Sequence, residues 1–126
     1  MIGIDGCLAR MMAIPGAQGV TLIDCASGLA VAAAGREDLV DQHEDAAGST
    51  DVVRAVLASP ALSATRTGDD IQEIIICGAS GYHLLALLNE DIDGLLCVHL
   101  WLDRDKGNLA LARMSVQYLM REMVGQ

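Results

Sequence analysis

The sequence is poor in aromatic and basic side chains. It contains no phenylalanine, one tryptophan and two tyrosines, so few side chains are available to stack on bases or sugars. Only 8 lysine and arginine residues stand against 17 aspartate and glutamate residues, which gives a net charge of -9. An acidic surface repels nucleic-acid phosphates and anionic membranes. We therefore expect neither of these as a partner.

The chain also lacks a membrane-spanning run and a basic leader. No apolar run approaches the roughly 20 residues that cross a bilayer, and Asp5 and Arg10 interrupt the first apolar stretch. At this length one core can bury roughly two thirds of the unfolded surface. We expect residues 1–126 to form a single cytoplasmic domain without membrane insertion.

Metal-binding and redox motifs are missing as well. No Cys-x-x-Cys pair or zinc-finger spacing occurs among the cysteines and histidines, which are Cys7, Cys25, Cys77, Cys97, His43, His83 and His99. We interpret the thiols as reduced structural side chains and the histidines as surface or satisfied core residues. No metal ion or cofactor is expected.

The strongest positive signal is a group of three short apolar runs, at residues 71–77, 82–88 and 95–102. Short runs separated by turn residues predict a three-stranded antiparallel meander. Ile74, Ile75 and Ile76 are consecutive, so apolar side chains lie on both faces of the sheet. Both faces must then be covered, and the flanking segments have to supply the helices.

Apolar spacing predicts the remaining elements: a short helix capped by Asp5, a β-hairpin, a long amphipathic helix and a last helix, at residues 2–13, 19–34, 35–60 and about 109–123. Asp105 or Asn108 can cap the last helix. The expected order is helix, two strands, helix, three strands, helix.

The long helix is acidic in its first half. Residues 37–51 contain six acids and no base. The helix macrodipole favours negative charge only near the first turn, so Glu44, Asp45 and Asp51 need another explanation. One interpretation is a solvated face, and the other is contact with a basic partner. Gly48 lowers helix stability by about 1 kcal/mol relative to alanine, which the close approach of another backbone would offset.

No catalytic motif is complete. Gly78-Ala79-Ser80-Gly81-Tyr82 begins like a nucleophile elbow, but Tyr82 replaces the last glycine and the segment joins two strands. The single lysine, Lys106, does not stand in a phosphate-binding loop. The acids are interpreted as lying in turns and on the outer side of a helix, where burial does not tune a pKa. We expect no enzyme.

Three motifs accompany this order of elements: Ile14-Pro15-Gly16-Ala17-x-Gly19-Val20, Leu22-Ile23-Asp24-x-x-Ser27-Gly28-Leu29 and Leu102-Asp103-x-x-x-x-Asn108-Leu109-Ala110-Leu111-Ala112-Arg113. Together they resemble the Roadblock family of dynein-light-chain-like proteins, in particular its stand-alone bacterial members. The resemblance covers essentially the whole chain. It implies an α+β sandwich with a five-stranded antiparallel sheet in the order 2-1-5-4-3, the first and last helices on one face and the long middle helix on the other. It also implies a homodimer that regulates or scaffolds a small Ras-like GTPase.

That strand order places residues 71–77 at a sheet edge, where an unpaired apolar strand invites aggregation. Pairing with a second copy removes the exposed edge. The expected dimer surface consists of Ile71, Glu73, Ile74, Ile75, Ile76 and Cys77 from the strand, with Ala46, Ala47 and Gly48 from the long helix.

The expected GTPase contacts are Glu44, Asp45, Asp51 and Arg54. Arg54 is a candidate for an arginine that acts on the bound nucleotide, while positioning of the GTPase's own residues and plain scaffolding stay open. The alternative function is a small-ligand or redox sensor without a GTPase partner, with a pocket between helix and sheet and a thiol such as Cys97.

Overall fold

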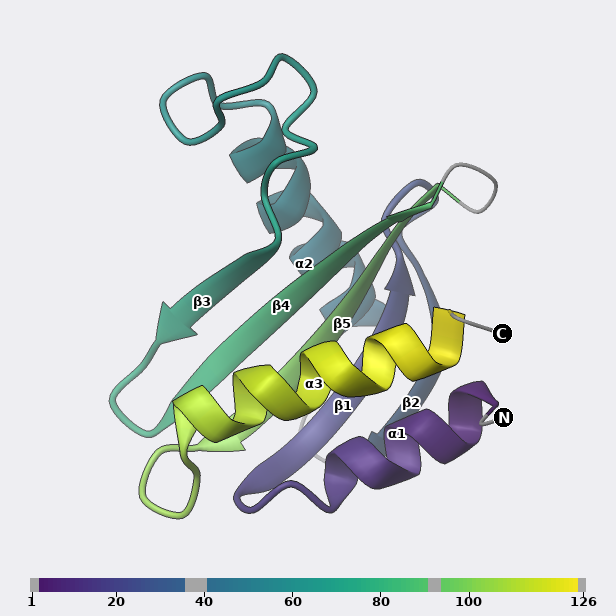
Figure 1. Cartoon of the computed structure of the whole chain (residues 1–126), viewed down its shortest axis with the longest axis vertical. Helices are drawn as coiled ribbons and strands as arrows, with labels where there is room; N and C mark the ends of the chain where they lie inside the picture. The colour runs from purple at the N-terminus through teal and green to yellow at the C-terminus, as the bar shows by residue number, and fades with distance from the viewer. Residues whose placement is uncertain (1–2, 36–40, 91–93, 125–126) are drawn as a thin grey trace.

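The computed structural model describes residues 3–35, 41–90 and 94–124 (Figure 1). Its elements are α1 (Ile4–Met12), β1 (Ala17–Asp24), β2 (Leu29–Gly35), α2 (Gln42–Leu57), β3 (Glu73–Cys77), β4 (Gly81–Glu90), β5 (Gly94–Asp103) and α3 (Leu109–Val124). This is the predicted order. The part of the predicted long helix at residues 36–40 lies outside the described residues. Within the described ranges no helix has the length and apolar character needed to cross a membrane.

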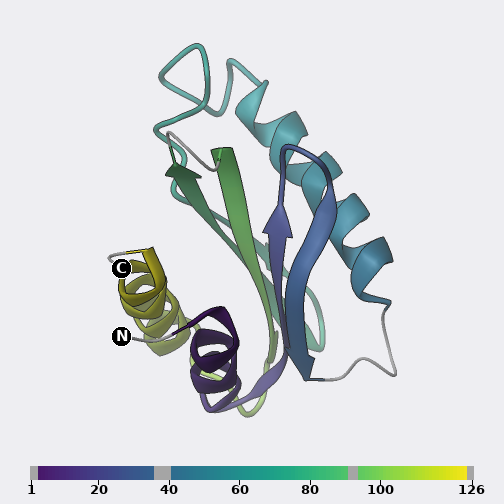
Figure 2. The same cartoon turned by 90° about the vertical axis from the view of Figure 1, so that its right-hand side faces the viewer.

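The five strands form one antiparallel sheet in the order β2-β1-β5-β4-β3. Helices α1 and α3 lie side by side on one face of the sheet, and α2 crosses the other face (Figures 1 and 2). The predicted α+β sandwich and its strand order are therefore confirmed. β2 and β3 are the two edge strands.

The larger core lies between the sheet and the α1–α3 layer. Strand side chains alternate between the two faces, so the even-numbered residues Leu84, Leu100 and Leu22 point to this side and meet Leu8 of α1 and Val116 of α3. All five are at most 1% exposed. Burial of a Leu, Ile or Val side chain contributes about 1.5–3 kcal/mol, which makes this layer the main hydrophobic support of the fold.

The core under α2 is smaller and more polar. Ala46 and Val53 of α2 pack on Ile23, Leu85 and Cys97 of the sheet. The other buried residues of α2 are Ser49 and Thr50. The N-terminal half of α2 therefore has little apolar surface with which to hold the sheet, and polar contacts have to supply the rest.

Side-chain caps set the starts of two helices. Asp41 accepts a hydrogen bond from the His43 N–H at 2.8 Å and begins α2. Asn108 accepts from the Leu111 N–H at 3.0 Å and begins α3, which selects Asn108 over Asp105 as the cap. The helix predicted at residues 2–13 is present as α1, but its predicted cap was wrong, because α1 begins after Gly3 without a side-chain cap and Asp5 lies within its first turn.

Candidate functional site

The first candidate site is the free edge of β3. Among the described residues this strand pairs only with β4, in a register that sets Ile75 opposite Leu84 and Ile76 opposite His83. Ile76 thus faces the α2 side and Ile75 the α1–α3 side. Their side chains are 42% and 36% exposed. An unpaired strand edge with exposed isoleucines on both faces is a surface on which another strand can pair.

The expected dimer residues divide into three groups. Ile74, Ile75, Ile76 and Cys77 form β3 itself, and Ile71 lies just before it. Glu73 begins the strand but points to α3, where it makes an ion pair with Arg113 and accepts a hydrogen bond from Gln117 at 3.4 Å. On α2, Ala47 and Gly48 are exposed, whereas Ala46 is fully buried against its own sheet. Ala46 therefore lies in the core of its own chain and not on an exposed surface.

The second candidate site is the acidic flank of α2. Glu44 and Asp51 are both exposed, and they lie on the same side of the helix about two turns apart. Asp45 differs, because its side chain turns toward the sheet and is only 13% exposed. The interpretation that all helix acids lie on the outer side was wrong for Asp45. Asp45 is the neighbour of Ala46, which is fully buried against the sheet, so this part of the helix surface faces the strands.

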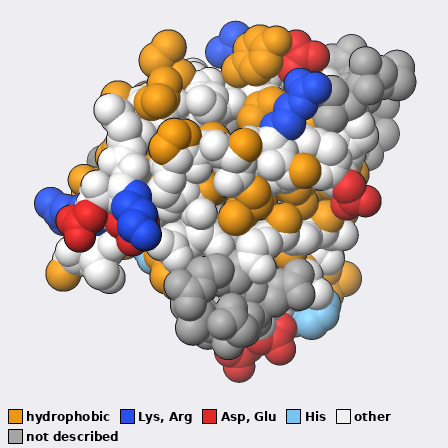
Figure 3. Space-filling model, turned by 90° about the horizontal axis from the view of Figure 1, so that it is seen from below, with side chains coloured by type: hydrophobic (Ala, Val, Ile, Leu, Met, Phe, Trp, Pro, Cys, Tyr) orange, Lys and Arg blue, Asp and Glu red, His pale blue; other side chains and the backbone are white. Residues whose placement is uncertain are grey.

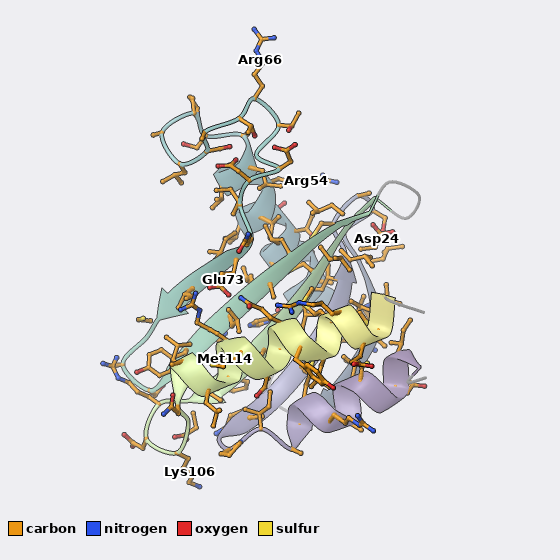
Figure 4. All side chains as sticks on the ribbon, in the orientation of Figure 1. Asp24, Arg54, Arg66, Glu73, Lys106 and Met114 are labelled. Carbon is orange, nitrogen blue, oxygen red and sulfur yellow. The ribbon has the colours of Figure 1, made fainter. Side chains whose placement is uncertain are left out.

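Arg54 is engaged within its own chain. Its guanidinium donates to the Cys25 carbonyl at 2.9 and 3.2 Å and to the Ala26 carbonyl at 2.6 Å. These bonds join the C-terminal half of α2 to the turn between β1 and β2, near Asp24 (Figure 4). The side chain of Arg54 therefore holds α2 to the β1–β2 turn of its own chain.

The side chain of Asp45 begins a hydrogen-bonded chain that sequence reasoning missed. Asp45 Oδ1 lies 2.7 Å from His99 Nδ1, and His99 Nε2 lies 2.8 Å from His83 Nδ1. The Ser49 hydroxyl also donates to Asp45 Oδ1 at 3.0 Å. The His83 ring stacks on Trp101, with centroids 6.0 Å apart and planes inclined by 14°. Side chains from α2, β4 and β5 thus meet in one polar cluster under the N-terminal half of α2.

Burial and hydrogen bonding act against each other in this cluster. Burial raises the pKa of Asp45, but the hydrogen bond and charge of His99, with the hydroxyl groups of Thr21 and Ser49, lower it more, so the net shift is downward. Burial lowers the pKa of His83, and positive charge on His99 lowers it further, against the opposing effect of Asp45. The site therefore favours an ionised Asp45 and a neutral His83.

A cavity of about 100 Å³ opens beside this cluster. Its walls include Ala33 and Ala34 of β2, Trp101 and His83, with Gln42 of α2 at one side. The described lining residues do not include Cys97. Among the residues that the structure describes, no group of three histidine, cysteine, aspartate or glutamate side chains is placed to hold a metal ion.

Three of the four thiols are buried, and two of them interact. The hydrogen bond from Cys97 lowers the pKa of Cys25 to about 7 despite burial, and Thr50 also donates to the Cys25 sulfur at 3.9 Å. The same hydrogen bond and burial raise the pKa of Cys97. Cys77 is the exposed thiol, on the free edge of β3.

A further exposed apolar surface lies on the opposite face. Leu111, Met114 and Tyr118 of α3 are 50%, 69% and 59% exposed, and with Arg10 and Pro15 they line a groove between α1 and α3. In the view from below, hydrophobic side chains gather over the upper and middle part of the molecule, and acidic and basic side chains lie around its margins (Figure 3).

Sequence spacing alone could not bring the polar cluster together, since Asp45 and His99 are 54 positions apart. One signal was available. His83 and His99 occupy the same alternating positions as the buried Leu85 and Cys97, so each points to the α2 face. Two histidines facing inward on neighbouring strands need polar partners.

No family model matches the sequence, and no curated protein matches it. Several solved structures, however, match it in fold. MglB of Myxococcus xanthus is 17% identical, with a TM-score of 0.77 over 93% of this chain and 81% of that chain. A Roadblock/LC7 domain from Streptomyces avermitilis is 15% identical, with a TM-score of 0.76 over 98% and 96%. The gliding protein MglB of Thermus thermophilus is 16% identical, with a TM-score of 0.74 over 93% and 82%.

The chain therefore has the fold of the Roadblock/LC7 domain, and the resemblance seen in the sequence is confirmed at the level of the fold. At these identities the likeness defines the architecture.

Proposed function

We propose that this chain is a non-catalytic binding protein, a homodimeric cytoplasmic regulator or scaffold of a small Ras-like GTPase in a bacterial signalling system. The observation that carries the proposal is the Roadblock/LC7 fold over nearly the whole chain, because the family resemblance implies this role. Another solved relative in fold is described as MglB with tetrameric arrangement, which supports assembly between copies. The buried unpaired thiols fit a reducing compartment.

The proposed dimer joins two β3 edges. Antiparallel addition of a second β3 would pair the free backbone groups and cover the exposed parts of Ile75 and Ile76 on both faces. A two-fold axis at this joint brings the two α2 helices to the same side of the combined sheet. Ala47 and Gly48 are exposed there, and a Cβ added at Gly48 meets no atom within 4 Å among the described residues. A neighbouring helix has room to approach.

The dimer is tested by light scattering on Ile76→Lys, with Val31→Lys as the matched control. Val31 is 50% exposed on β2, the other edge of the sheet. The wild-type chain should have twice the 13.2 kDa mass of one copy. Lysine at the β3 edge should reduce the mass to one copy, and lysine on β2 should leave it unchanged. A wild-type monomer at all concentrations would refute the dimer.

The proposed GTPase surface is the exposed side of α2, with Glu44 and Asp51 facing a basic partner. Such charges steer and select partners more than they add affinity. The test is a pull-down from lysate of the source organism with GDP or a non-hydrolysable GTP analogue. Recovery of a small GTPase with the analogue only indicates a regulator of the active state, and equal recovery indicates a scaffold. Recovery with neither contradicts the proposal.

Charge reversal locates the GTPase surface. Glu44→Lys with Asp51→Lys should reduce recovery several-fold, because both charges would then repel a basic partner. Asp5→Lys on α1 is the matched control, since Asp5 is exposed on the opposite face of the molecule. Arg54→Ala tests the arginine hypothesis. An unchanged stimulated rate of GTP hydrolysis would show that Arg54 does not act on the nucleotide.

The alternative, a small-ligand sensor, is favoured by one observation, the cavity beside His83 and Trp101. Its test is protection from thermal unfolding by a panel of metabolites. A metabolite that raises the melting temperature in wild type, but not when Ala34→Leu fills the cavity, would support this function.

A further inference from the structure

The cluster of Asp45, His99 and His83 can be assigned its protons from its geometry. An ionised Asp45 accepts the Nδ1 proton of His99, which leaves a lone pair on His99 Nε2. That lone pair accepts the Nδ1 proton of His83. His83 Nε2 then carries the last lone pair. No buried side-chain nitrogen or oxygen in the described part of the chain lacks a partner, so this nitrogen reaches solvent.

One additional proton fits this arrangement. When it binds His83 Nε2, the proton between the two rings can lie on either nitrogen without a change in the 2.8 Å contact. If it lies on His99, a cationic imidazolium faces Asp45 and forms an ion pair with it. The cluster as a whole is then neutral, so the first proton is held without a new unpaired charge.

A second proton does not fit. With both rings cationic, each of the two facing nitrogens carries a hydrogen, and two donors oppose each other at a contact of 2.8 Å. Asp45 can balance only one of the two charges. The other described residues that line the cavity beside the rings or pair with the histidines across the sheet are uncharged, among them Thr21 of β1, Ala33 of β2, Gln42 of α2, Ile76 of β3 and Trp101 of β5. The contact between His83 and His99 must therefore break.

We propose that Asp45, His99 and His83 form a proton-binding site that holds one extra proton intact and opens when a second proton binds, so that acid loosens the N-terminal half of α2 from the sheet. His83 is the ring that moves, because it lies at the solvent end of the chain of hydrogen bonds. His99 stays beside Asp45.

The two halves of α2 should respond differently. The N-terminal half rests on Ala46 and on the polar contacts of Asp45. The C-terminal half is held by the fully buried Val53 and by the bonds of Arg54 to the β1–β2 turn. Loss of the cluster removes support from the first half only. The exposed Glu44, Ala47 and Gly48 belong to that half, so the proposed dimer and GTPase contacts would become sensitive to acid. This last step rests on the proposed function, whereas the proton site itself does not.

The direct test is ¹⁵N NMR of the histidine rings in the full chain as pH falls from 8 to 4.5. His43 is exposed and serves as the internal reference. At high pH both His83 and His99 should carry their proton on Nδ1. The pair should then take up its two protons in separate steps, the second at lower pH than the titration of His43. Two rings that titrate independently in one step with His43 would overturn the proposal.

The consequence for α2 is measured by amide hydrogen exchange and by the fluorescence of Trp101, the only tryptophan. When the second proton binds, exchange at residues 44–49 should increase by at least about tenfold after correction for intrinsic rates, and residues 53–57 should change little. Trp101 fluorescence should change at the same pH because the stacked His83 leaves. Equal acceleration in both halves of α2 would indicate general unfolding and contradict the proposal.

A conservative variant separates charge from shape. In His83→Gln the side-chain amide can still donate to His99 but cannot take up a proton. The variant should lose the acid-dependent change at residues 44–49, and His43→Gln should keep it. An acid response of His83→Gln equal to that of wild type would overturn the proposal. Each measurement uses the chain alone, so failure to find a GTPase would leave the result on the proton site unaffected.

Discussion

Arg54 stabilises the fold by joining two elements of its own chain. The guanidinium donates to the carbonyls of Cys25 and Ala26, and these carbonyls would lose charge-assisted partners in Arg54→Ala. We expect a loss of about 1–2 kcal/mol in the free energy of unfolding by urea. Arg66→Ala is the control, because Arg66 makes no hydrogen bond or ion pair with the described residues, and its change should stay within about 0.5 kcal/mol. Similar losses in the two variants would show that the bonds to the β1–β2 turn contribute nothing.

Asp45 and His83 should make the fold less stable in acid. The folded-state pKa of His83 is lowered, so the unfolded chain takes up its proton first, and stability falls as pH drops below the unfolded value of about 6.5. The folded-state pKa of Asp45 is also lowered, so its contribution is present above about 3.9 and is lost as pH falls through the folded value. Both groups therefore lower the stability of the fold as the pH falls.

Unfolding free energies measured from pH 8 to 3 separate the two contributions. His83→Gln should flatten the profile between about pH 6.5 and 5, and Asp45→Asn should reduce the loss below about pH 4. Asp70 and Asp103, whose pKa values are lowered by hydrogen bonds from Ser63 and from the Lys106 N–H, contribute to the same acid range and remain in both variants. Asp51→Asn, at an exposed position, is the control. A profile for Asp45→Asn that follows the wild-type curve throughout would refute the assignment.

Two turns between elements depend on glycine for different reasons. Gly16, between α1 and β1, has φ of +87°, and a Cβ there would lie 2.6 Å from the backbone of Gly107. Gly94, at the start of β5, has φ of +78° with no described atom within 4 Å of that position. Gly94→Ala should therefore lower stability only by the left-handed strain, about 1–2 kcal/mol. Gly16→Ala should lower it clearly more, because two backbone segments cannot yield. Equal losses in urea unfolding would show that the turns at Gly16 and Gly107 can separate.

The elements themselves were largely readable from the sequence because each depends on local patterns. The apolar runs predicted β3, β4 and β5, Pro60 predicted the end of α2, and Asn108 supplied the cap of α3. The cluster of Asp45, His99 and His83 was not readable, since it depends on the register between β4 and β5 and on the rotation of α2 about its axis. Acidic neighbours such as Glu44 are indistinguishable from Asp45 until that rotation is known.

On the scale of the whole molecule, charge is unevenly distributed. Residues 1–17 and 103–126, which contain α1 and α3, hold five of the eight basic residues and four of the seventeen acidic ones. All of the excess negative charge therefore belongs to the sheet, its loops and α2, because the α1 and α3 segments hold one more base than acids. In the proposed dimer the two α2 helices share one side of the joined sheet. A basic partner should then approach the α2 side, while the α1–α3 groove with Met114 stays uncovered.

This charge distribution predicts how partner binding depends on salt. If the GTPase docks on the α2 side, its association rate should fall several-fold between 50 and 300 mM NaCl, because exposed charges are screened over about 10 Å at 0.1 M salt. Glu44→Lys with Asp51→Lys should remove most of this dependence, and Asp5→Lys should preserve it. Stopped-flow or biolayer measurements on the GTPase recovered by pull-down give the rates. A salt dependence unaffected by the α2 charges, but reduced by Met114→Lys or Asp5→Lys, would move the docking surface to the α1–α3 face. The acidic side of the molecule would then be a solvated face, as the first interpretation of the sequence allowed.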